Sequence, residues 1–559
     1  MKLWRGIISA ALILSMTVPA WAAPGEQLTV QQRREDLNVL YENLKKGHPN
    51  LFANTPEEEF LARKGEIEAG LDAASDQEFF LDLMSLTALA GDSHTSAALG
   101  DQTQLMRAYP FSLTWREGKW YLSALLAEHR ELLGREVISA AGKPVAQAAE
   151  AFCGLLSADN PVKLRRQFRQ ACNVADLYEY LGLVEAGEPL VLTLAEGTEL
   201  SLAPVSMEEL GNIEMAQLGE GLPRPVTAAQ DCYYCAFPLN SDTYYIQYNT
   251  CAADPELPME QFAAQAAEEL GNYRRVVVDL RNNGGGSDGV LWPLLEVLRQ
   301  EMDRGAELVG LIGETTFSSA IINAVELQEM GGVLVGEPAS GSVDHFGSVG
   351  SFRLPNSGLR VGVSQKYIDM DTLFDAGAGR GVEALEPDVT VLRTMEDTLA
   401  GRDTAVEWLL AHPGRLEQRD YPDAPLTRGR FAALLWQKAG SPQGTEAGFA
   451  DTFGIEWFLP ALSWAAEQGV LSGVGGGAVQ AARPVTRQEA AVMLARYAGL
   501  TGADAQSWTD WEEIAPWARE AVAAVTSAGL MHGENGAFRP LETLTRAEGE
   551  AMISMLDGW

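Results

Sequence analysis

The sequence is short of basic residues. Its 559 residues include 41 Lys and Arg against 77 Asp and Glu, which gives a formal net charge of −36. A nucleic-acid-binding protein needs a basic surface to neutralise phosphates, so we expect no nucleic-acid partner. Hydrophobic residues make up 46% and charged residues 21% of the chain. This composition is typical of a globular protein, and the length predicts several domains.

Cysteine is also scarce, with five residues at positions 153, 172, 232, 235 and 251. Cys232 and Cys235 have the CxxC spacing, but neither a second CxxC nor a histidine pair completes a tetrahedral zinc site. We therefore expect no metal, and we interpret the cysteines as buried or locally paired.

No apolar run in the sequence is long enough to span a bilayer comfortably, including the one near the start. Lys2 and Arg5 precede an apolar segment from Ile7 to Val18, and Ala20-Trp21-Ala22 has the small-x-small form of a cleavage site. We predict a signal peptide over residues 1–22 and a secreted chain with no transmembrane segment after cleavage. An uncleaved membrane anchor is the alternative.

The apolar pattern divides the remaining chain into regions. Apolar residues recur at helical spacing near Leu37 to Leu44, and the runs "RRVVVDL", "AELVGLIG" and "GGVLVGEP" read as buried strands that alternate with helices. The fold class is therefore α/β with C-terminal helical repeats. The predicted units are a helical subdomain (23–100), a mixed β/α and weakly PDZ-like subdomain (101–235), an α/β core (236–412), a linker (413–425) and repeats (426–440, 449–499 and 508–558).

The C-terminal segments repeat one pattern, "LTRGRFAALL", "VTRQEAAVML" and "LTRAEGEAMI". Their threonines, Thr427, Thr486 and Thr545, are evenly spaced, 59 residues apart. Self-similarity of this kind indicates repeat architecture. The second and third copies are nearly complete and start at Phe449 and Trp508, whereas the first copy keeps only its end.

Two segments of the α/β core suit acyl-transfer chemistry. In "VVVDLRNNGGGSDG" (276–289) a strand ends in a turn of three glycines, whose amides can form an anion-binding hole. No Gly-Lys-Ser/Thr follows, so the turn is not a P-loop. In "ETTFSSAIINAVELQEMGG" (314–332), Ser318 is predicted at a helix N-terminus, where free amides favour negative charge. The alternative is that Ser318 only caps the helix.

A serine nucleophile needs a nearby base, and the chain has six histidines, at positions 48, 94, 129, 345, 412 and 532. His412 and His532 fall in or beside the linker and the repeats, which leaves four candidates. His94 stands in "LAGDSHTSAAL", after a helical stretch and a Gly-Asp turn.

The segments "GDSHT", "DLRNNGGG", "TFSSA" and "VGEPASG" occur in an order that resembles the tail-specific (C-terminal processing) proteases, family 41 of the serine peptidases. The resemblance covers roughly residues 30–412. It implies a crotonase/ClpP-like α/β core, a peptide or protein substrate and no cofactor. Matched by position, Ser318 is the nucleophile. The amide of Ser319 and one from the Gly284–Gly286 turn, for which we choose Gly285, form the oxyanion hole.

One departure from the processing proteases concerns the base. Their lysine follows the "GEP" segment, but "GEPASGSVDHFGSVG" contains no lysine and Ser342 stands near its place. The chain therefore resembles the tricorn-like, histidine-type branch of the family. That resemblance implies His94 as the base, with Ser93 orienting either His94 or an acidic partner.

The acidic partner and the base both have rivals. The resemblance implies a glutamate downstream of the nucleophile, and Glu383 in "GVEALEPDV" is our first choice, with Glu386 and Asp375 behind it. His345 and Lys366 lie near the nucleophile in the sequence and are rival bases.

The repeats resemble S-layer-homology domains. In that family the arginine of the "TR" pair binds anionic, often pyruvylated, wall polymers, which implies Arg428, Arg487 and Arg546 as polymer-binding residues. The alternative is that each "TRxE" is a helix capping box. The implied partner is an anionic secondary cell-wall polymer, and the implied location is the surface of a bacterium.

Taken together, these patterns predict a secreted, cell-wall-attached serine endopeptidase that acts through an acyl-enzyme at Ser318. Two alternatives use the same fold: a catalytically inactive surface binding protein and a non-proteolytic acyl hydrolase.

Overall fold

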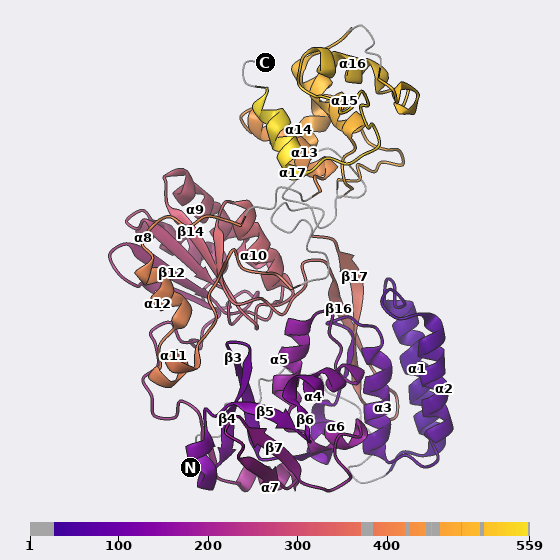
Figure 1. Ribbon diagram of the computed structural model, residues 1–559, viewed down its shortest axis with the longest axis vertical. Helices are drawn as coiled ribbons and strands as arrows, with labels where there is room; N and C mark the ends of the chain where they lie inside the picture. Colours follow the sequence, from indigo (N-terminus) through magenta and orange to yellow (C-terminus); the bar gives the residue numbers. More distant parts are fainter. Residues whose placement is uncertain are drawn as a thin grey trace.

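The computed structural model describes residues 27–370, 384–419, 425–442, 449, 459–481, 483–502 and 508–556. The predicted signal peptide and two candidate acidic partners, Glu383 and Asp375, lie outside the described residues. Figure 1 shows an N-terminal half built of helices and small sheets, an α/β core, and a helical C-terminal region.

Three helices open the described chain: α1 (Val30–Gly47), α2 (Glu57–Gly70) and α3 (Asp76–Ala88). Thr29 begins α1 with a capping box to Gln32, which satisfies backbone amides that a helix start leaves free. Leu37, Leu40 and Leu44 are fully buried, as their helical spacing predicts.

A mixed region follows and contains three small antiparallel sheets. Their strand orders are β10-β4-β3, β6-β5-β7-β8 and β2-β9. The strands are β2 (Arg107–Ala108), β3 (Phe111–Arg116), β4 (Lys119–Leu126), β5 (Val137–Ala140), β6 (Lys143–Pro144), β7 (Leu190–Leu194), β8 (Glu199–Leu202), β9 (Val205–Ser206) and β10 (Met215–Gln217), and the helices are α4 (Val145–Ala151), α5 (Pro161–Ala171), α6 (Ala175–Tyr180) and α7 (Met207–Asn212).

The α/β core is a six-stranded sheet of order β11-β12-β13-β14-β15-β18, parallel except for β11. The strands are β11 (Tyr234–Pro238), β12 (Thr243–Tyr248), β13 (Arg275–Asp279), β14 (Glu307–Ile312), β15 (Val333–Gly336) and β18 (Val389–Thr390), and the helices are α8 (Met259–Leu270), α9 (Trp292–Asp303), α10 (Ser319–Glu329), α11 (Met395–Ala400) and α12 (Thr404–Ala411). The predicted alternation of strands and helices is confirmed.

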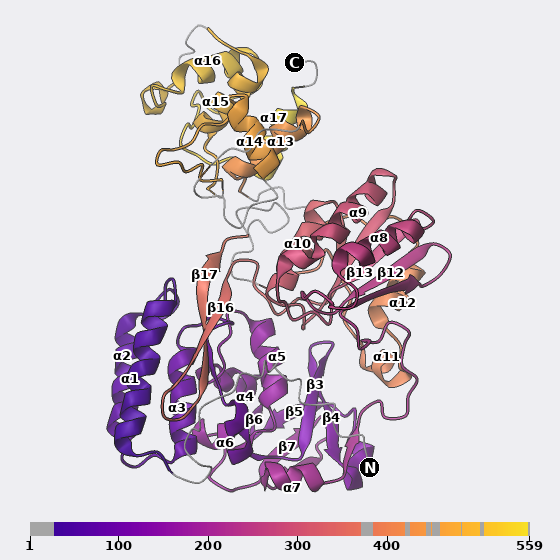
Figure 2. The same cartoon turned by 180° about the vertical axis from the view of Figure 1, so that it is seen from behind.

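Helices cover both faces of this sheet (Figures 1 and 2). Because side chains alternate along a strand, Val276 and Val278 pack with α8, α9 and α10, whereas Val277 packs with α12 on the opposite face. Burial on both faces explains why β13 reads as a continuous apolar run.

A long hairpin links the core to the N-terminal half (Figure 2). Its strands, β16 (His345–Arg353) and β17 (Arg360–Ile368), form a sheet of order β1-β17-β16 with β1 (Ser96–Ala98). The buried carboxylate of Asp36 on α1 accepts hydrogen bonds from the amides of Asn356 and Ser357 at the hairpin turn. Since β1 pairs with β17, the segment that carries His94 lies against this hairpin.

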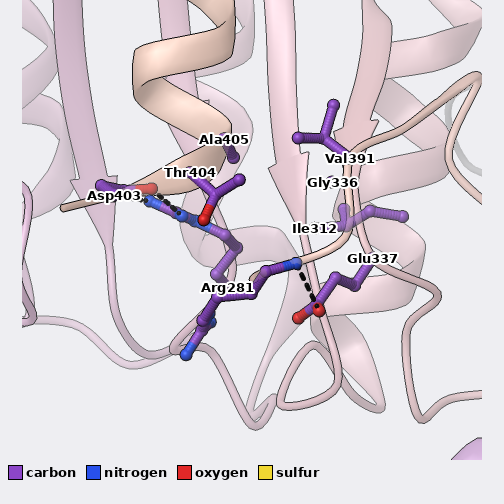
Figure 3. Close-up of a pocket in the computed structure, with 9 residues that line it drawn as sticks. Arg281, Ile312, Gly336, Glu337, Val391, Asp403, Thr404 and Ala405 are labelled. Carbon is purple, nitrogen blue, oxygen red and sulfur yellow. Dashed lines mark hydrogen bonds and ion pairs between the residues drawn. The ribbon is translucent and has the colours of Figure 1, made fainter. Parts of the chain in front are cut away.

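The arginine of "DLRNNGGG" has a structural role. Arg281 pairs with Asp279 at 2.6 Å. It also pairs with Asp403, which begins α12, at 2.7 Å (Figure 3). Burial would raise the pKa of Asp403, but Arg281 holds it down at about 2. The small pocket in Figure 3 is lined by Arg281, Glu337 and their neighbours but by none of the predicted catalytic residues.

The C-terminal region contains α13 (Arg428–Lys438), α14 (Leu459–Glu467), α15 (Arg487–Ala498), α16 (Arg519–Ser527) and α17 (Arg546–Ser554). The three repeat arms meet in a ring of backbone hydrogen bonds, from Leu426 to Leu544, from Leu544 to Val485 and from Val485 back to Leu426. The first copy, of which the sequence keeps only the end, therefore still supplies the segment at Leu426 and helix α13 to a junction of all three copies.

None of the described helices is long and apolar enough to cross a membrane. All five cysteines are free thiols in this structure.

Candidate active site

Ser318 stands immediately before α10, as predicted, but its side chain does not cap the helix. Its backbone has φ 55° and ψ −130°, a conformation that L-residues rarely adopt and that costs energy to hold. Strain of this kind, at the turn that leads from the carboxyl end of β14 into a helix, presents a side chain outward, as in nucleophile elbows. The capping alternative for Ser318 is therefore wrong.

The glycine turn lies directly against Ser318. A Cβ atom added at Gly285, which has φ 100°, would lie 2.7 Å from Ser318 Cβ and 2.8 Å from the carbonyl oxygen of Phe317. The neighbouring Ser319 hydroxyl donates to the carbonyl oxygen of Gly286. Glycine is required because the backbone of the turn touches the segment that carries the serine.

Two backbone amides were predicted to form the oxyanion hole. The Ser319 amide is in the first turn of α10, and no hydrogen bond from it to a described residue is present. The Gly285 amide donates to Asn283 Oδ1 at 2.9 Å, so in this structure it already has an acceptor. Asn283 is fully buried and is held by its own bond to the carbonyl oxygen of Tyr248.

The structure brings His94 to the residue before Ser318. The His94 ring stacks on Phe317 with centroids 4.5 Å apart. The side chain is almost fully buried, and neither ring nitrogen has a hydrogen-bond partner among the described residues. Burial, with the nearby His345, lowers the pKa of His94 to about 3, so the ring is neutral at pH 7.

His345 lies behind His94, with ring centroids 5.5 Å apart. Its Nδ1 donates to the carbonyl oxygen of Ser342 at 3.0 Å, which fixes the tautomer with a lone pair on Nε2. Burial lowers the pKa of His345 as well. The other rival base, Lys366, lies exposed on β17, opposite Gly347.

An acid that the sequence did not single out lies against Ser93, the residue before His94. Ser93 Oγ donates to Asp159 Oδ1 at 2.5 Å, and the Asp159 amide donates back to Ser93 Oγ. Asn160, the residue that caps α5, donates to Asp159 and to Ser342 Oγ. The predicted role of Ser93 in orienting an acid thus has a candidate partner in Asp159, while Glu383 lies outside the described residues.

A second buried carboxylate, Asp92, fixes the backbone of this segment. It accepts hydrogen bonds from the His94 amide, the Ser364 hydroxyl, the Thr95 hydroxyl and His48. Burial would raise the pKa of Asp92, but these four bonds hold it below its usual value. The "GDSHT" motif is therefore a scaffold in which Asp92 ties the histidine segment to β17.

The predicted polymer-binding arginines differ in exposure. Arg428 and Arg487 are buried: Arg428 donates to the carbonyl oxygens of Ser472 and Val479, and Arg487 donates to those of His532 and Phe538. Each thus holds the loop of the following repeat. The side chain of Arg546 is 24% exposed and pairs with Glu550 at 2.9 Å. Thr486 and Thr545 form the alternative capping boxes.

Residues 448–491 and 509–548 match the family described as S-layer homology domain. The C-terminal region is made of SLH domains. In alignments of 151 positions that cover 25% of this chain, the sequence is 30% identical to an amylopullulanase of Thermoanaerobacterium thermosulfurigenes and 28% identical to the exoglucanase XynX of Acetivibrio thermocellus. The match spans only 8% and 14% of those two proteins.

Among solved structures, the chain is similar to mature CPAF complexed with lactacystin, with a TM-score of 0.48 and 15% identity over 68% of this chain and 97% of that one. It is also similar to the photosystem II D1 C-terminal processing protease, with a TM-score of 0.32 and 14% identity over 67% of this chain and 98% of that one.

Proposed function

We propose that the chain is a serine endopeptidase in which Ser318 attacks the peptide carbonyl and His94 accepts the hydroxyl proton. The Ser318 oxygen forms the bond to the carbonyl carbon while its proton passes to a ring nitrogen of His94. The protonated ring then gives that proton to the leaving amine as the peptide bond breaks. Water, deprotonated by the same ring, hydrolyses the acyl-enzyme and restores the Ser318 hydroxyl.

The oxyanion of the tetrahedral intermediate would be bound by the Ser319 amide and by an amide of the Gly284–Gly286 turn. Gly285 remains our choice, on the condition that its bond to Asn283 is released when substrate binds. Ser93 and Asp159 would hold the histidine side of the site in place, and Glu383 stays a proposed further partner. The strand and helix alternation of the core supports the proposed crotonase/ClpP-like arrangement.

The observation that carries this proposal is the backbone of Ser318. A serine that serves only as a cap has no need of a positive φ, and here the strained Ser318 does not cap the helix with its side chain. The buried, neutral His94 stacks on Phe317, the residue before Ser318. No hydrogen bond joins His94 to Ser318 in this structure. Catalytic hydrogen bonds often tighten only in the substrate complex.

Cleavage of an unstructured protein substrate tests the proposal. Ser318→Ala should abolish cleavage, while Ser319→Ala, which removes the hydroxyl next to it, should retain part of the activity. Both variants should unfold at nearly the wild-type temperature. Cleavage by Ser318→Ala at the wild-type rate would reject the nucleophile, and a wild-type protein that cleaves no peptide would favour the surface-binding alternative.

We propose further that the exported protein is attached to the bacterial wall by the SLH domains, which would bind an anionic polymer. Of the three matched arginines, Arg546 has the most exposed side chain, at 24%. The full chain should sediment with purified cell walls and remain soluble with walls from which the secondary polymer has been extracted. Equal sedimentation with both preparations would contradict polymer binding.

A further inference from the structure

Helix α5 presents an unusual concentration of cations in a chain of net charge −36. Its sequence, "PVKLRRQFRQA", carries Lys163, Arg165, Arg166 and Arg169 within seven residues. Of these, Arg169 pairs with Glu314 at 2.7 Å. No ion pair from Lys163, Arg165 or Arg166 to a described residue is present. Lys163 is buried and Arg165 and Arg166 are half-buried. Because a buried cation without an ion pair loses hydration that nothing replaces, an anion that enters here would be stabilised.

Two of these cations, Lys163 and Arg166, lie over the ring of Phe317, the residue before the nucleophile. Lys163 Nζ lies 3.3 Å from the centroid of the Phe317 ring, and the Arg166 guanidinium lies 6.0 Å from the same centroid. Arg165 lies next to them over the Trp115 ring, at 4.8 Å. Since Phe317 immediately precedes Ser318, this face of α5 borders the bond to be cleaved.

Arg166 also contacts the segment at Ser340 and Gly341, which lies against Ser318. Its Nη1 donates to Ser340 Oγ at 3.1 Å. A Cβ atom added at the next residue, Gly341, would lie 3.5 Å from the Ser318 amide nitrogen. The guanidinium is therefore held beside the segment that lies over the nucleophile, and its remaining N–H groups make no hydrogen bond to a described residue.

Lys163 is the second, independent indication of a ligand. It is 7% exposed, and no hydrogen bond or ion pair joins its Nζ to a described residue. Burial, with Arg166 nearby, lowers the pKa of Lys163 to about 7. Asp159 and Asp92 are the acids near it, but both are occupied by hydroxyl groups. An entering carboxylate would meet an amine with its hydrogen-bonding capacity unused.

From this geometry we propose that α5 forms a carboxylate-binding subsite beside Ser318, with Arg166 and Lys163 as its recognition groups. The substrate class is a peptide with an acidic group close to the scissile bond, either an Asp or Glu side chain or the C-terminal carboxylate. This inference rests on the proposed peptidase function and adds its specificity. A guanidinium pairs with a carboxylate through two parallel hydrogen bonds, one to each oxygen. A neutral amide has a single acceptor oxygen and cannot form both.

The test compares matched peptides. Cleavage sites are first mapped in a mixed peptide library, and the best peptide is then made with Glu or Gln at the acidic position and with a free or amidated C-terminus. We expect kcat/KM for the acidic peptide to exceed that for its neutral partner by about tenfold, the value of one charged hydrogen-bonded pair. The Glu/Gln pair and the acid/amide pair distinguish a side-chain carboxylate from a C-terminal one.

Variants on one helix identify the residues responsible. Arg166→Gln should reduce the acidic-to-neutral ratio toward one, whereas Arg169→Gln, which removes a cation already paired with Glu314, should keep the wild-type ratio. Labelling of Ser318 by a serine-reactive probe is measured in parallel. A wild-type enzyme that reacts with the probe and cleaves acidic and neutral peptides equally would overturn the subsite, and a ratio that survives Arg166→Gln would overturn the assignment of Arg166. A protein that neither reacts nor cleaves would instead overturn the proposed function.

Discussion

Replacing Gly285 with alanine places a methyl group between the glycine turn and the nucleophile. The new Cβ would lie 2.7 Å from Ser318 Cβ and 2.8 Å from the carbonyl oxygen of Phe317, and the backbone at φ 100° disfavours any side chain. Strain at such a φ costs about 1–3 kcal/mol, and overpacking of this size adds about as much. Because Phe317 meets the methyl group with backbone, the turn and Ser318 must move apart.

A displacement of about 1 Å at a reacting centre can lower a rate by about 100-fold. We therefore expect Gly285→Ala to react with a fluorophosphonate probe at least about 100-fold more slowly than wild type, while it still folds and melts at a lower temperature. Gly284→Ala is the matched control, because a Cβ atom there meets no atom within 4 Å and the φ is not positive. It should change stability by less than about 0.5 kcal/mol and keep nearly the wild-type labelling rate.

Labelling and melting are measured on the same preparations, at a temperature well below both transitions. A folded Gly285→Ala protein that reacts at the wild-type rate would refute the close approach of the glycine turn to Ser318. Equal losses in Gly285→Ala and Gly284→Ala would point instead to a general effect of methyl groups on the turn.

Two further predictions concern stability. Because burial lowers the pKa of His94 to about 3, against about 6.5 in the unfolded chain, the unfolded state binds more protons between these values, and stability should fall by about 2 kcal/mol between pH 7 and pH 5. Urea unfolding of His94→Gln should show a shallower pH dependence in this window, and an unchanged slope would contradict the burial of the ring. In the SLH domains, Arg487→Ala leaves the carbonyl oxygens of His532 and Phe538 without their donor and should cost about 2–4 kcal/mol, whereas Arg546→Ala should leave the melting temperature nearly unchanged and weaken sedimentation with cell walls. Equal melting temperatures for the two arginine variants would contradict the structural role of Arg487.

Local patterns predicted much of the fold from the sequence. The start of α10 at Ser319, the buried strand β13 and the helical spacing in α1 all follow from periodicity and from turn residues, which act over a few positions. The positive φ of Ser318 could not be predicted this way. The turn around Ser318 packs against Gly285, more than 30 positions earlier, and a local pattern does not include that contact.

The parts of the site that the sequence did not reveal depend on distant contacts. Asp159 meets Ser93 from 66 residues away, and an Asp-Asn-Pro run at a helix start gives no sign of that role beyond a cap. Helix α5 likewise reads as a basic amphipathic segment, and only the fold shows that Lys163 reaches the ring beside the nucleophile. For Arg428 the repeat pattern is the same whether the side chain binds a polymer or a neighbouring loop, and the structure shows the loop contact.

The most direct test of the account is the site of covalent labelling. The wild-type protein is treated with a fluorophosphonate probe and digested, and the adduct is located by mass spectrometry. We predict a single adduct on Ser318 that is lost in Ser318→Ala and retained in Ser319→Ala. An adduct on another serine, or full labelling of Ser318→Ala, would contradict the assignment of Ser318 as the nucleophile.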